Sequence, residues 1–271
     1  MAARFFVVPE WQGSVNARAM RLADGAEAIR GDLPSASTTH VTVPLGAGSD
    51  EGTAVRRLSA IAGTRDALAL ELAASSGLPI VVGGDCGVEL AAVPAAVRPD
   101  TAVLWFDAHP DLNTPESSPS GAFGGMVLRT LLGEGADALR PASPILGANV
   151  VIVGARAIDD GELEYLDAAN ITLLAPDAAT PAALSAALAA TGATSLYVHI
   201  DVDVLDPGEL EGVSDPVPFG LTLSTLLELI GIARGALPLV GAGIAGFAPA
   251  SPDAAADDLG SILRIVGALA S

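Results

Sequence analysis

The sequence predicts an α/β protein, in which a mostly parallel central sheet is covered by helices on both faces to give three α/β/α layers. Three observations carry this prediction. Short apolar runs rich in β-branched residues alternate along the chain with segments whose apolar residues recur at helical spacing. Such alternation is typical of a parallel sheet whose strands are joined by helices. The 271 residues, 51% of them hydrophobic, suffice for one large core, so we expect a single domain over residues 1–271.

Strands are expected where apolar, β-branched runs lie between turn-forming residues. In chain order these are residues 4–9, 40–43, 79–82, 101–106, 149–153, 171–174, 195–200 and 237–247. The short run at 171–174 is expected at an edge of the sheet.

Helices are expected between these strands. The apolar residues that follow a period near 3.6 within 56–76 are Leu58, Ile61, Ala62, Leu68 and Leu72. Further helices are expected within 11–31, from about 88, and over 126–132, 181–190, 221–234 and 253–270. Thr180 is expected to cap the helix that begins after it, and the loop at 208–218 is expected to form a pocket wall.

The net charge is −19, which excludes partners that need a cationic surface. We therefore expect neither nucleic acid nor an anionic membrane as a partner. The single cysteine allows no internal disulfide, and the N-terminal apolar run is too short for a secretory signal. No stretch is typical of a membrane span. These observations together predict a cytoplasmic protein.

The stretch TAVLWFDAHPDLN at 101–113 is an apolar run that ends in two acids and a histidine. If the extended backbone continues past Phe106, Asp107, His109 and Asp111 point the same way at the carboxyl end of a strand. Carboxylates with one imidazole suit a divalent ion such as Mn²⁺. The alternative is that the two acids only cap a loop and that His109 fills a corner.

A second acidic stretch, HIDVDVLDP at 199–207, follows the apolar run at 195–200. Asp201 and Asp203 alternate onto one face and would repel unless a cation lies between them. Acid pairs at the ends of two buried strands indicate a two-metal site. His199 should share the face of Asp201, where a core or supporting position is favoured over a ligand.

A third stretch, GGDCG at 83–87, follows the strand at 79–82. Its glycines permit backbone conformations closed to other residues and could aim Cys86 at the same rim. On spacing alone, Cys86 is better interpreted as a small buried hydrophobe.

These three stretches, in this order, resemble the metal motifs of the arginase family of ureohydrolases, whose usual forms are GGDH, DAHxDxN and SxDxDxxDP. The resemblance runs from about Gly83 to about Pro249 and implies the arginase-like fold. It implies two Mn²⁺ ions bridged by Asp107 and Asp201, one completed by Asp111 and Cys86 and the other by His109 and Asp203. A hydroxide between the ions would attack an amidine or guanidine carbon, with Asp111 as the catalytic acid or base. The resemblance also implies a homo-oligomer, a trimer or a hexamer.

Three positions depart from the family pattern. Cys86 replaces the histidine of the first motif, so Zn²⁺ or Fe²⁺ is possible beside Mn²⁺. Gly124 stands where arginases carry a proton-shuttling histidine, and Gly246 where they carry the glutamate that binds the guanidinium. Without that carboxylate, ordinary turnover of arginine or agmatine is not expected.

The opposite end of the pocket matches the family. Asn113 and Ser120 correspond to residues that hold an α-carboxylate, and Asp159, in RAIDDGE at 156–162, to the aspartate that faces the α-amino group. The alternative is that 159–162 is an acid cluster at a helix N-terminus.

The expected activity is therefore metal-dependent hydrolysis of a C–N bond in an amidino or guanidino compound, with an amino-acid substrate suggested by the intact head-group positions. One alternative is a catalytically inactive family member that serves binding or assembly. Another is a formimino-compound hydrolase, which would release formamide or ammonia rather than urea.

Overall fold

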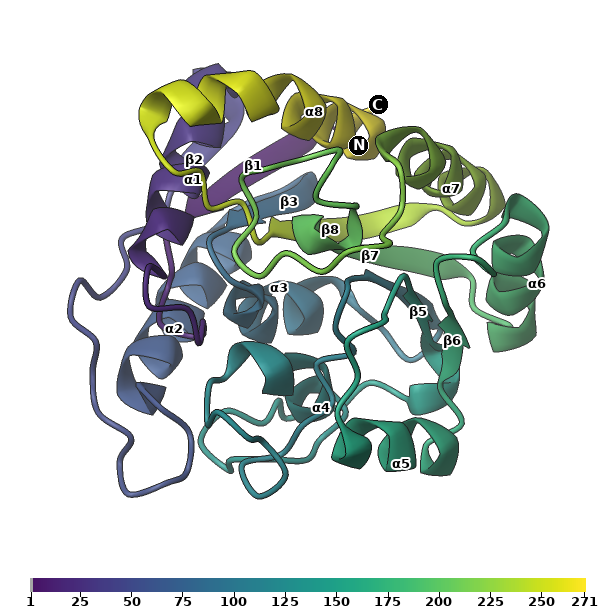
Figure 1. Cartoon of the computed structure of the whole chain (residues 1–271), viewed down its shortest axis with the longest axis horizontal. Coiled ribbons are helices and arrows are strands. Elements are labelled where there is room, and N and C mark those ends of the chain that lie inside the picture. The colour runs from purple at the N-terminus through teal and green to yellow at the C-terminus, as the bar shows by residue number, and fades with distance from the viewer. Residues whose placement is uncertain (1) are drawn as a thin grey trace.

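The computed structural model describes residues 2–271, and within them the strands form one eight-stranded sheet (Figure 1). The strands are β1 (Ala3–Val8), β2 (Thr38–His40), β3 (Leu78–Gly83), β4 (Thr101–Phe106), β5 (Val150–Val153), β6 (Thr172–Leu174), β7 (Ser195–Asp201) and β8 (Leu239–Ala245). Their order across the sheet is β2-β1-β3-β8-β7-β4-β5-β6. Every neighbouring pair is parallel, so all carboxyl ends lie along one edge of the sheet. The expected parallel sheet, with the run near 171–174 at its edge, is confirmed.

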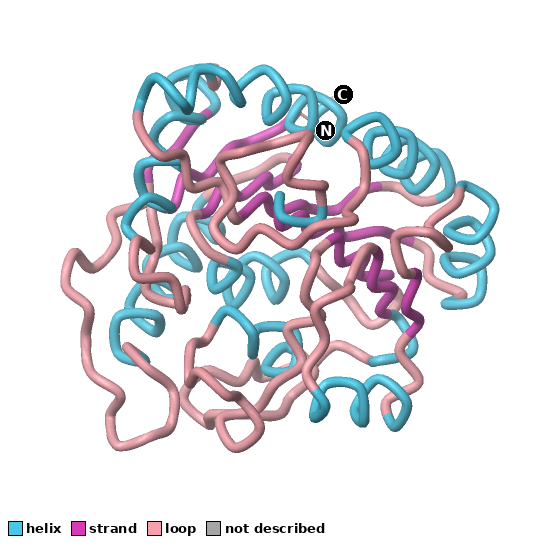
Figure 2. Tube along the Cα trace, in the orientation of Figure 1, coloured by secondary structure: helices cyan, strands magenta, loops and turns pink. Residues whose placement is uncertain are grey.

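Helices cover both faces of the sheet (Figures 1 and 2). On one face lie α1 (Met20–Asp32), α6 (Pro181–Thr191), α7 (Leu223–Ala236) and α8 (Pro252–Ala270). On the other lie α2 (Leu58–Ala74), α3 (Glu89–Ala96), α4 (Val127–Leu131) and α5 (Asp160–Ala168). Figure 2 shows the magenta strands enclosed between the two rows of cyan helices. The predicted three-layer α/β/α architecture is confirmed.

Each face of the sheet has its own hydrophobic core because side chains alternate along a strand. In β1, Phe5 and Val7 pack with α1 and its neighbours, while Phe6 and Val8 pack with α2. A strand that is buried on both faces needs apolar residues at every position, which is why these strands appear as uninterrupted apolar runs.

Two strands differ from their expected ranges by two residues or more, for identifiable reasons. β2 lies at Thr38–His40 rather than 40–43. Its partner β1 ends at Val8, and the last hydrogen bond along this edge runs from the Val41 N–H to the Val7 carbonyl, at 2.9 Å. β8 is shorter than 237–247, since Pro238 has no N–H to donate and Gly246 adopts a left-handed backbone with φ of 87°.

Short 3-10 turns lie next to several of the strands and helices. They are η1 (Ser35–Ser37), η2 (Cys86–Val88), η3 (Gly124–Met126), η4 (Gly147–Asn149) and η5 (Val202–Val204). The helix expected at 126–132 is therefore η3 followed by the short α4. The expected cap of α6 is confirmed, because the Thr180 hydroxyl accepts a hydrogen bond from the Ala183 N–H at 3.2 Å.

None of the helices in residues 2–271 combines the length and the apolar character that crossing a membrane requires.

Candidate metal centre

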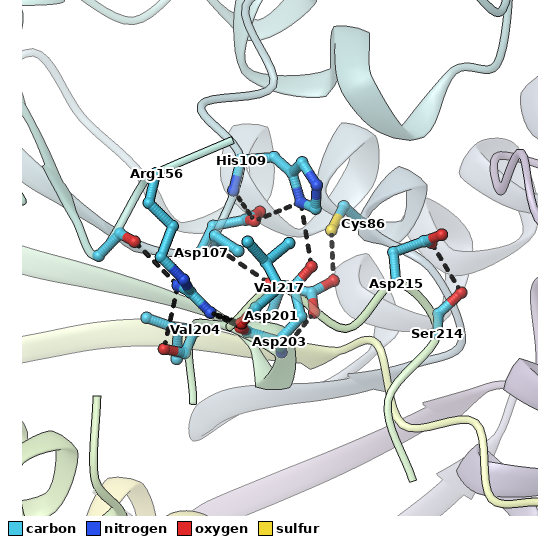
Figure 3. A network of polar contacts seen from close by, with 12 residues as sticks. Cys86, Asp107, His109, Arg156, Asp201, Asp203, Val204, Ser214, Asp215 and Val217 are labelled. Atoms are coloured by element: carbon cyan, nitrogen blue, oxygen red, sulfur yellow. Dashed lines mark hydrogen bonds and ion pairs between the residues drawn. The ribbon is translucent and has the colours of Figure 1, made fainter. Parts of the chain in front are cut away.

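Three strand ends bring the acidic motifs together at the carboxyl edge of the sheet (Figure 3). η2 follows β3 and carries Cys86, the loop after β4 carries the second motif, and β7 leads into η5 with the third. A cavity of about 500 Å³ lies between them. All nine residues singled out from the sequence line it: Cys86, Asp107, His109, Asp111, Asn113, Ser120, Asp159, Asp201 and Asp203. Their individual roles stay predictions.

The first motif forms a tight turn held by Asp85. The Asp85 carboxylate accepts hydrogen bonds from the Gly87 N–H and the Gly13 N–H, both at 2.8 Å. The expectation that the glycines supply unusual backbone angles is wrong at Gly84, where the requirement is for space. A Cβ atom there would lie 1.6 Å from the Glu10 carbonyl oxygen. This close approach places Cys86, which is buried, against the carboxylates.

The second motif does not continue the strand, which ends at Phe106. Asp107 folds the chain back by accepting a hydrogen bond from the His109 N–H at 2.7 Å, and Asp111 is left-handed with φ of 54°. The prediction that extended backbone aligns these side chains is therefore wrong. The three side chains reach the cavity through a turn instead.

His109 bridges the second and third motifs. Its Nδ1 atom lies 3.0 Å from Asp203 Oδ2 and 3.4 Å from Asp107 Oδ1. Burial lowers the pKa of His109, but the hydrogen bonds with the two carboxylates outweigh it and raise the pKa to about 12. These three residues offer ligand atoms close enough together to hold one metal ion.

The third motif also turns after its first acid. Asp201 ends β7 and accepts a hydrogen bond from the Asp203 N–H at 3.0 Å, as η5 begins. Asp203 accepts one from the Ala108 N–H, also at 3.0 Å, which joins the two acidic motifs. On the side of the first motif, the Cys86 thiol donates to Asp201 Oδ2 at 3.1 Å.

The buried carboxylates repel one another, and their pKa values record this. Burial first, and then the charge of Asp203, raises the pKa of Asp201 to about 7. Burial and the charge of Asp107 raise the pKa of Asp203 to about 6, and the pKa of Asp111 rises in the same direction. Asp111 Oδ2 is buried with no hydrogen-bond partner among residues 2–271. A divalent cation would satisfy that oxygen and offset the repulsion, so these residues fit metal ions.

His199 lies in the layer below the carboxylates, fully buried on β7. Its ring stacks on Trp105 with centroids 3.7 Å apart, and its Nδ1 atom lies 2.8 Å from Glu89 Oε1. Burial lowers the pKa of His199, but the hydrogen bond and charge of Glu89 raise it overall. Its Nε2 atom faces Asp107 Oδ2 at 3.9 Å. His199 thus occupies the expected core position, and its Nε2 atom also lies close to Asp107, one of the candidate metal ligands.

Hydrogen bonds order the end of the cavity that carries Asn113, Ser120 and Asp159. The Asn113 side-chain amide donates to Asp159 Oδ2 at 2.9 Å and accepts from the Ser117 hydroxyl at 2.8 Å. Ser120 accepts from the Ala122 N–H at 3.1 Å. Asp159 is also the N-cap residue of α5, as the alternative interpretation predicted, and its role toward an α-amino group stays a prediction.

Two residues that support the site had no role assigned from the sequence. Glu162 is buried in α5 and accepts hydrogen bonds from the Leu112 and Asp159 N–H groups, both at 2.9 Å. Arg156 donates to the backbone carbonyls of Gly154, Asp203, Val204, Leu205, Val217 and Pro218. It thereby joins η5 to the 208–218 loop, the expected pocket wall, which contributes Ser214 and Asp215 to the cavity. Arg156 and Glu162 both belong to the stretch RAIDDGE at 156–162, and this was the only indication in the sequence that they support the site.

Gly246 and Gly124, the two glycines that depart from the family pattern, differ in the space available for a side chain. At Gly246, which has φ of 87°, a Cβ atom would lie 2.0 Å from Asp201 Oδ1. At Gly124 the nearest atom to a Cβ would be the Gly13 carbonyl oxygen at 3.3 Å. Both line the cavity, so no carboxylate and no imidazole stands where the family pattern places a glutamate and a histidine.

The fold and the cavity define a parallel three-layer α/β protein with an acidic centre suited to divalent ions. Comparison with known proteins specifies the class further: a model of the arginase family matches residues 24–261. The chain belongs to the arginase family, as its motifs predicted.

Three similar proteins illustrate the relationship. The chain is 35% identical over 206 residues to N(omega)-hydroxy-L-arginine amidinohydrolase from Streptomyces lavendulae, covering 73% of this chain and 71% of that one. It is 32% identical over 155 residues to arginase from Bacillus subtilis, where the match spans 53% of this chain and about half of the relative, 52%. The solved structure of Entamoeba histolytica arginase in complex with L-ornithine has a TM-score of 0.86 at 23% identity, covering 98% of this chain and 97% of that one. This last likeness establishes the arginase fold.

Proposed function

We propose that this chain is a metal-dependent amidinohydrolase whose substrate is an α-amino acid with a weakly basic guanidino-type side chain, of the Nω-hydroxyguanidino class. The observation that carries the proposal is the cavity itself. It joins the acidic centre to a head-group site containing Asn113 and Asp159, but it offers Gly246 where a carboxylate would bind a full cation.

The proposed metal ligands are the acidic motifs and Cys86. His109, Asp107 and Asp203 form one candidate group, and Asp201, Asp111 and Cys86 lie next to it. Divalent ions at such a site supply Lewis-acid activation of water at neutral pH. The mixed oxygen, nitrogen and sulfur donors are compatible with Mn²⁺, Zn²⁺ or Fe²⁺.

The head-group site suits an α-amino acid. Asp159 presents a carboxylate that can pair with an α-ammonium group, while Asn113 and Ser120 can donate hydrogen bonds to an α-carboxylate. The hydrogen bond between Asn113 and Asp159 holds both before substrate arrives, which lowers the entropic cost of binding.

The reacting end suits a substrate of low basicity. A guanidinium such as that of arginine keeps its charge and is bound best by a paired carboxylate. An N-hydroxyl group withdraws electrons and makes a guanidine less basic, so such a substrate can bind neutral where no carboxylate is present. The relative from Streptomyces lavendulae, named for an Nω-hydroxyguanidino substrate, supports this choice.

The proposed reaction is hydrolysis at the central guanidine carbon. Water attacks that carbon, the bond to the side-chain nitrogen breaks, and the products are a primary amine and hydroxyurea. Asp111 is the proposed proton carrier: its carboxylate would accept a proton from the water and return it to the departing nitrogen. Burial, and then the charge of Asp107, raise the pKa of Asp111 well above its usual value, which favours this role because the carboxylate then accepts a proton more readily.

The test measures metal content and product together. Protein purified without chelator is assayed by plasma mass spectrometry before and after metal loading, then with Nω-hydroxy-L-arginine and with L-arginine. We expect two ions per chain, release of hydroxyurea, and kcat/KM at least about tenfold higher for the hydroxylated substrate. Equal turnover of arginine, or release of formamide or ammonia from a formimino compound instead, would contradict the proposed substrate.

A second candidate is a catalytically inactive scaffold. Replacement at three family positions, Cys86, Gly124 and Gly246, favours it. Failure to retain metal after loading, together with no turnover of guanidino or formimino compounds, would establish this second candidate.

A further inference from the structure

A histidine outside the family's ligand pattern lies beside the candidate metal centre. We propose that His199 coordinates a metal ion through Nε2, together with the Cys86 thiolate and the Asp107 carboxylate. The inference rests on the metal dependence proposed above and assigns that dependence a different ligand set. In the family pattern, a histidine of the first motif binds this ion, and Cys86 stands in its place here. His199, on β7, would supply an imidazole to the same ion.

The geometry fits a shared ion. One ligand atom from each of Cys86, Asp107 and His199 lies within 4.8 Å of the other two. His199 Nε2 is 3.9 Å from Asp107 Oδ2. Ligands bound tetrahedrally at ordinary metal distances lie about 3.3–3.8 Å apart, so small side-chain adjustments suffice.

His199 Nε2 is the atom that needs a partner. The side chain is wholly buried, and no group in residues 2–271 forms a hydrogen bond with Nε2. A buried polar atom without a partner costs about 1–3 kcal/mol. Coordination removes that cost, whereas a purely structural histidine would bear it.

The opposite ring nitrogen is held as metal-bound histidines usually are. Nδ1 lies 2.8 Å from Glu89 Oε1, and the Tyr197 hydroxyl donates to Glu89 Oε2 at 2.6 Å. Metal-ligating histidines commonly donate their second N–H to a carboxylate, which fixes the tautomer and leaves the other nitrogen free for the metal. Trp105 stacking fixes the ring plane.

The backbone leaves room for this support. Gly243 on β8 lies opposite Glu89, and a Cβ atom at Gly243 would be 1.8 Å from Glu89 Oε1. The carboxylate therefore reaches the imidazole only because this position has no side chain.

The donor set predicts a preference at this ion. Sulfur, imidazole nitrogen and carboxylate oxygen together suit Zn²⁺, Co²⁺ or Fe²⁺ better than Mn²⁺. The neighbouring group of His109, Asp107 and Asp203, which contains no sulfur, remains the harder site.

Three histidines in the whole sequence make a direct test possible. The full chain is labelled with ¹⁵N-histidine and observed by NMR, first metal-free and then loaded with ¹¹³Cd²⁺ and desalted. We expect ¹¹³Cd–¹⁵N coupling at two imidazoles, those of His109 and His199. His40 pairs with Glu27 on the surface and serves as the uncoupled internal reference. Its signal is assigned with His40→Gln, and that of His109 with His109→Gln.

The outcomes separate this inference from the proposed function. Coupling at both His109 and His199 supports it. Coupling at His109 alone, with two ions retained, overturns the His199 assignment and leaves metal dependence standing. Failure to retain any ion overturns both. The measurement needs no substitution at buried His199, so a folding defect cannot imitate a negative result.

Discussion

Gly246 determines what the reacting end of the cavity can hold. Its left-handed backbone and its contact with Asp201 leave no room for a side chain. We expect Gly246→Glu to displace Asp201 and weaken metal retention by about tenfold or more, without creating efficient arginine hydrolysis. Metal stoichiometry after desalting and kcat/KM for arginine measure the two effects.

Gly124→His is the matched control for this substitution. Its backbone is not left-handed and the nearest obstacle is the Gly13 carbonyl at 3.3 Å, so the variant should fold and keep its metal after a small local shift. If Gly246→Glu retained metal as well as Gly124→His does, the steric role assigned to Gly246 would be wrong.

Cys86 makes the metal preference of the site testable at one position. We expect Cys86→His to increase Mn²⁺ retention, because an imidazole replaces a soft thiolate beside hard carboxylates. The ratio of Mn²⁺ to Zn²⁺ bound from an equimolar mixture, measured by plasma mass spectrometry, should rise. Unchanged metal content would show that Cys86 is not a ligand.

The sequence predicted which residues of the site lie together, but not the turns and contacts that position their side chains. Motif order sufficed to bring together Cys86, Asp107 and Asp201, because the carboxyl ends of parallel strands share an edge. The turn at Asp111 and the pairing of His199 with Glu89 depend on contacts between distant segments. Local alternation of side chains carries no information about such contacts.

Among the elements, α5 supports the metal motif through Glu162. This carboxylate accepts from the N–H groups of Leu112 and Asp159, next to left-handed Asp111. We expect Glu162→Ala to lower the free energy of unfolding by about 1–3 kcal/mol, since the buried Leu112 N–H and the part-buried Asp159 N–H lose their acceptor. Denaturant unfolding measures the change.

Glu162→Gln provides the graded comparison. Its single amide oxygen is a poorer match for two donors than a carboxylate, so its stability should lie between those of the wild type and Glu162→Ala. Equal stability of all three proteins would remove Glu162 from the support of the loop.

The 208–218 loop depends on Arg156, which ties it to η5 through backbone carbonyls. We expect Arg156→Met to increase amide exchange in residues 205–220 by about tenfold or more, because the carbonyls lose a shared donor. Hydrogen-exchange mass spectrometry resolves this segment.

Arg156→Lys keeps the charge but lacks the planar fork of donors. It should therefore protect the loop much less than arginine does. Full protection by lysine would show that charge alone, rather than the set of hydrogen bonds, holds the loop.

The elements themselves were largely predictable, and their ends less so. The buried strand β4 matched its apolar run residue for residue, and β1, β3, β5 and β7 came within one residue at each end, because both faces demand apolar side chains. β2 was misplaced, since its pairing is limited by where β1 ends rather than by its own composition. A strand's partner is a property of the sheet, not of the local sequence.

For the molecule as a whole, the acidic centre couples stability to pH. The pKa values of Asp201 and Glu162 are raised to about 7, and those of Asp85 and Asp203 to about 6, above the unfolded values near 4. Between about pH 4 and pH 7 the folded state thus binds more protons than the unfolded state, and stability falls as pH rises. His109 acts in the same direction above about pH 6.5.

We therefore expect metal-free protein to have a lower Tm at pH 8 than at pH 5.5. Metal at a hundredfold excess over Kd should stabilise the protein by about 2.7 kcal/mol. At one fixed metal concentration the stabilisation should be larger at pH 8, because ionised carboxylates bind metal more tightly and lower the Kd. Thermal unfolding with chelator and with metal measures both quantities. Asp201→Asn should flatten the metal-free dependence, and a Tm that rose with pH in chelator would contradict this coupling.

The position of β8 determines when the first motif can join the candidate metal centre during synthesis. β8 lies between β3 and β7 in the sheet, although the other seven strands precede it in the chain. Its pairing with Val82 on one side and Asp201 on the other brings the Cys86 thiol to Asp201. Until β8 is synthesised, no strand pairs with both β3 and β7, so the strands β2-β1-β3 are not joined to the strands β7-β4-β5-β6. The candidate group of Asp107, His109 and Asp203 follows the adjacent strands β4 and β7, which precede β8 in the chain, whereas the contact between Cys86 and Asp201 can form only after β8 has been made.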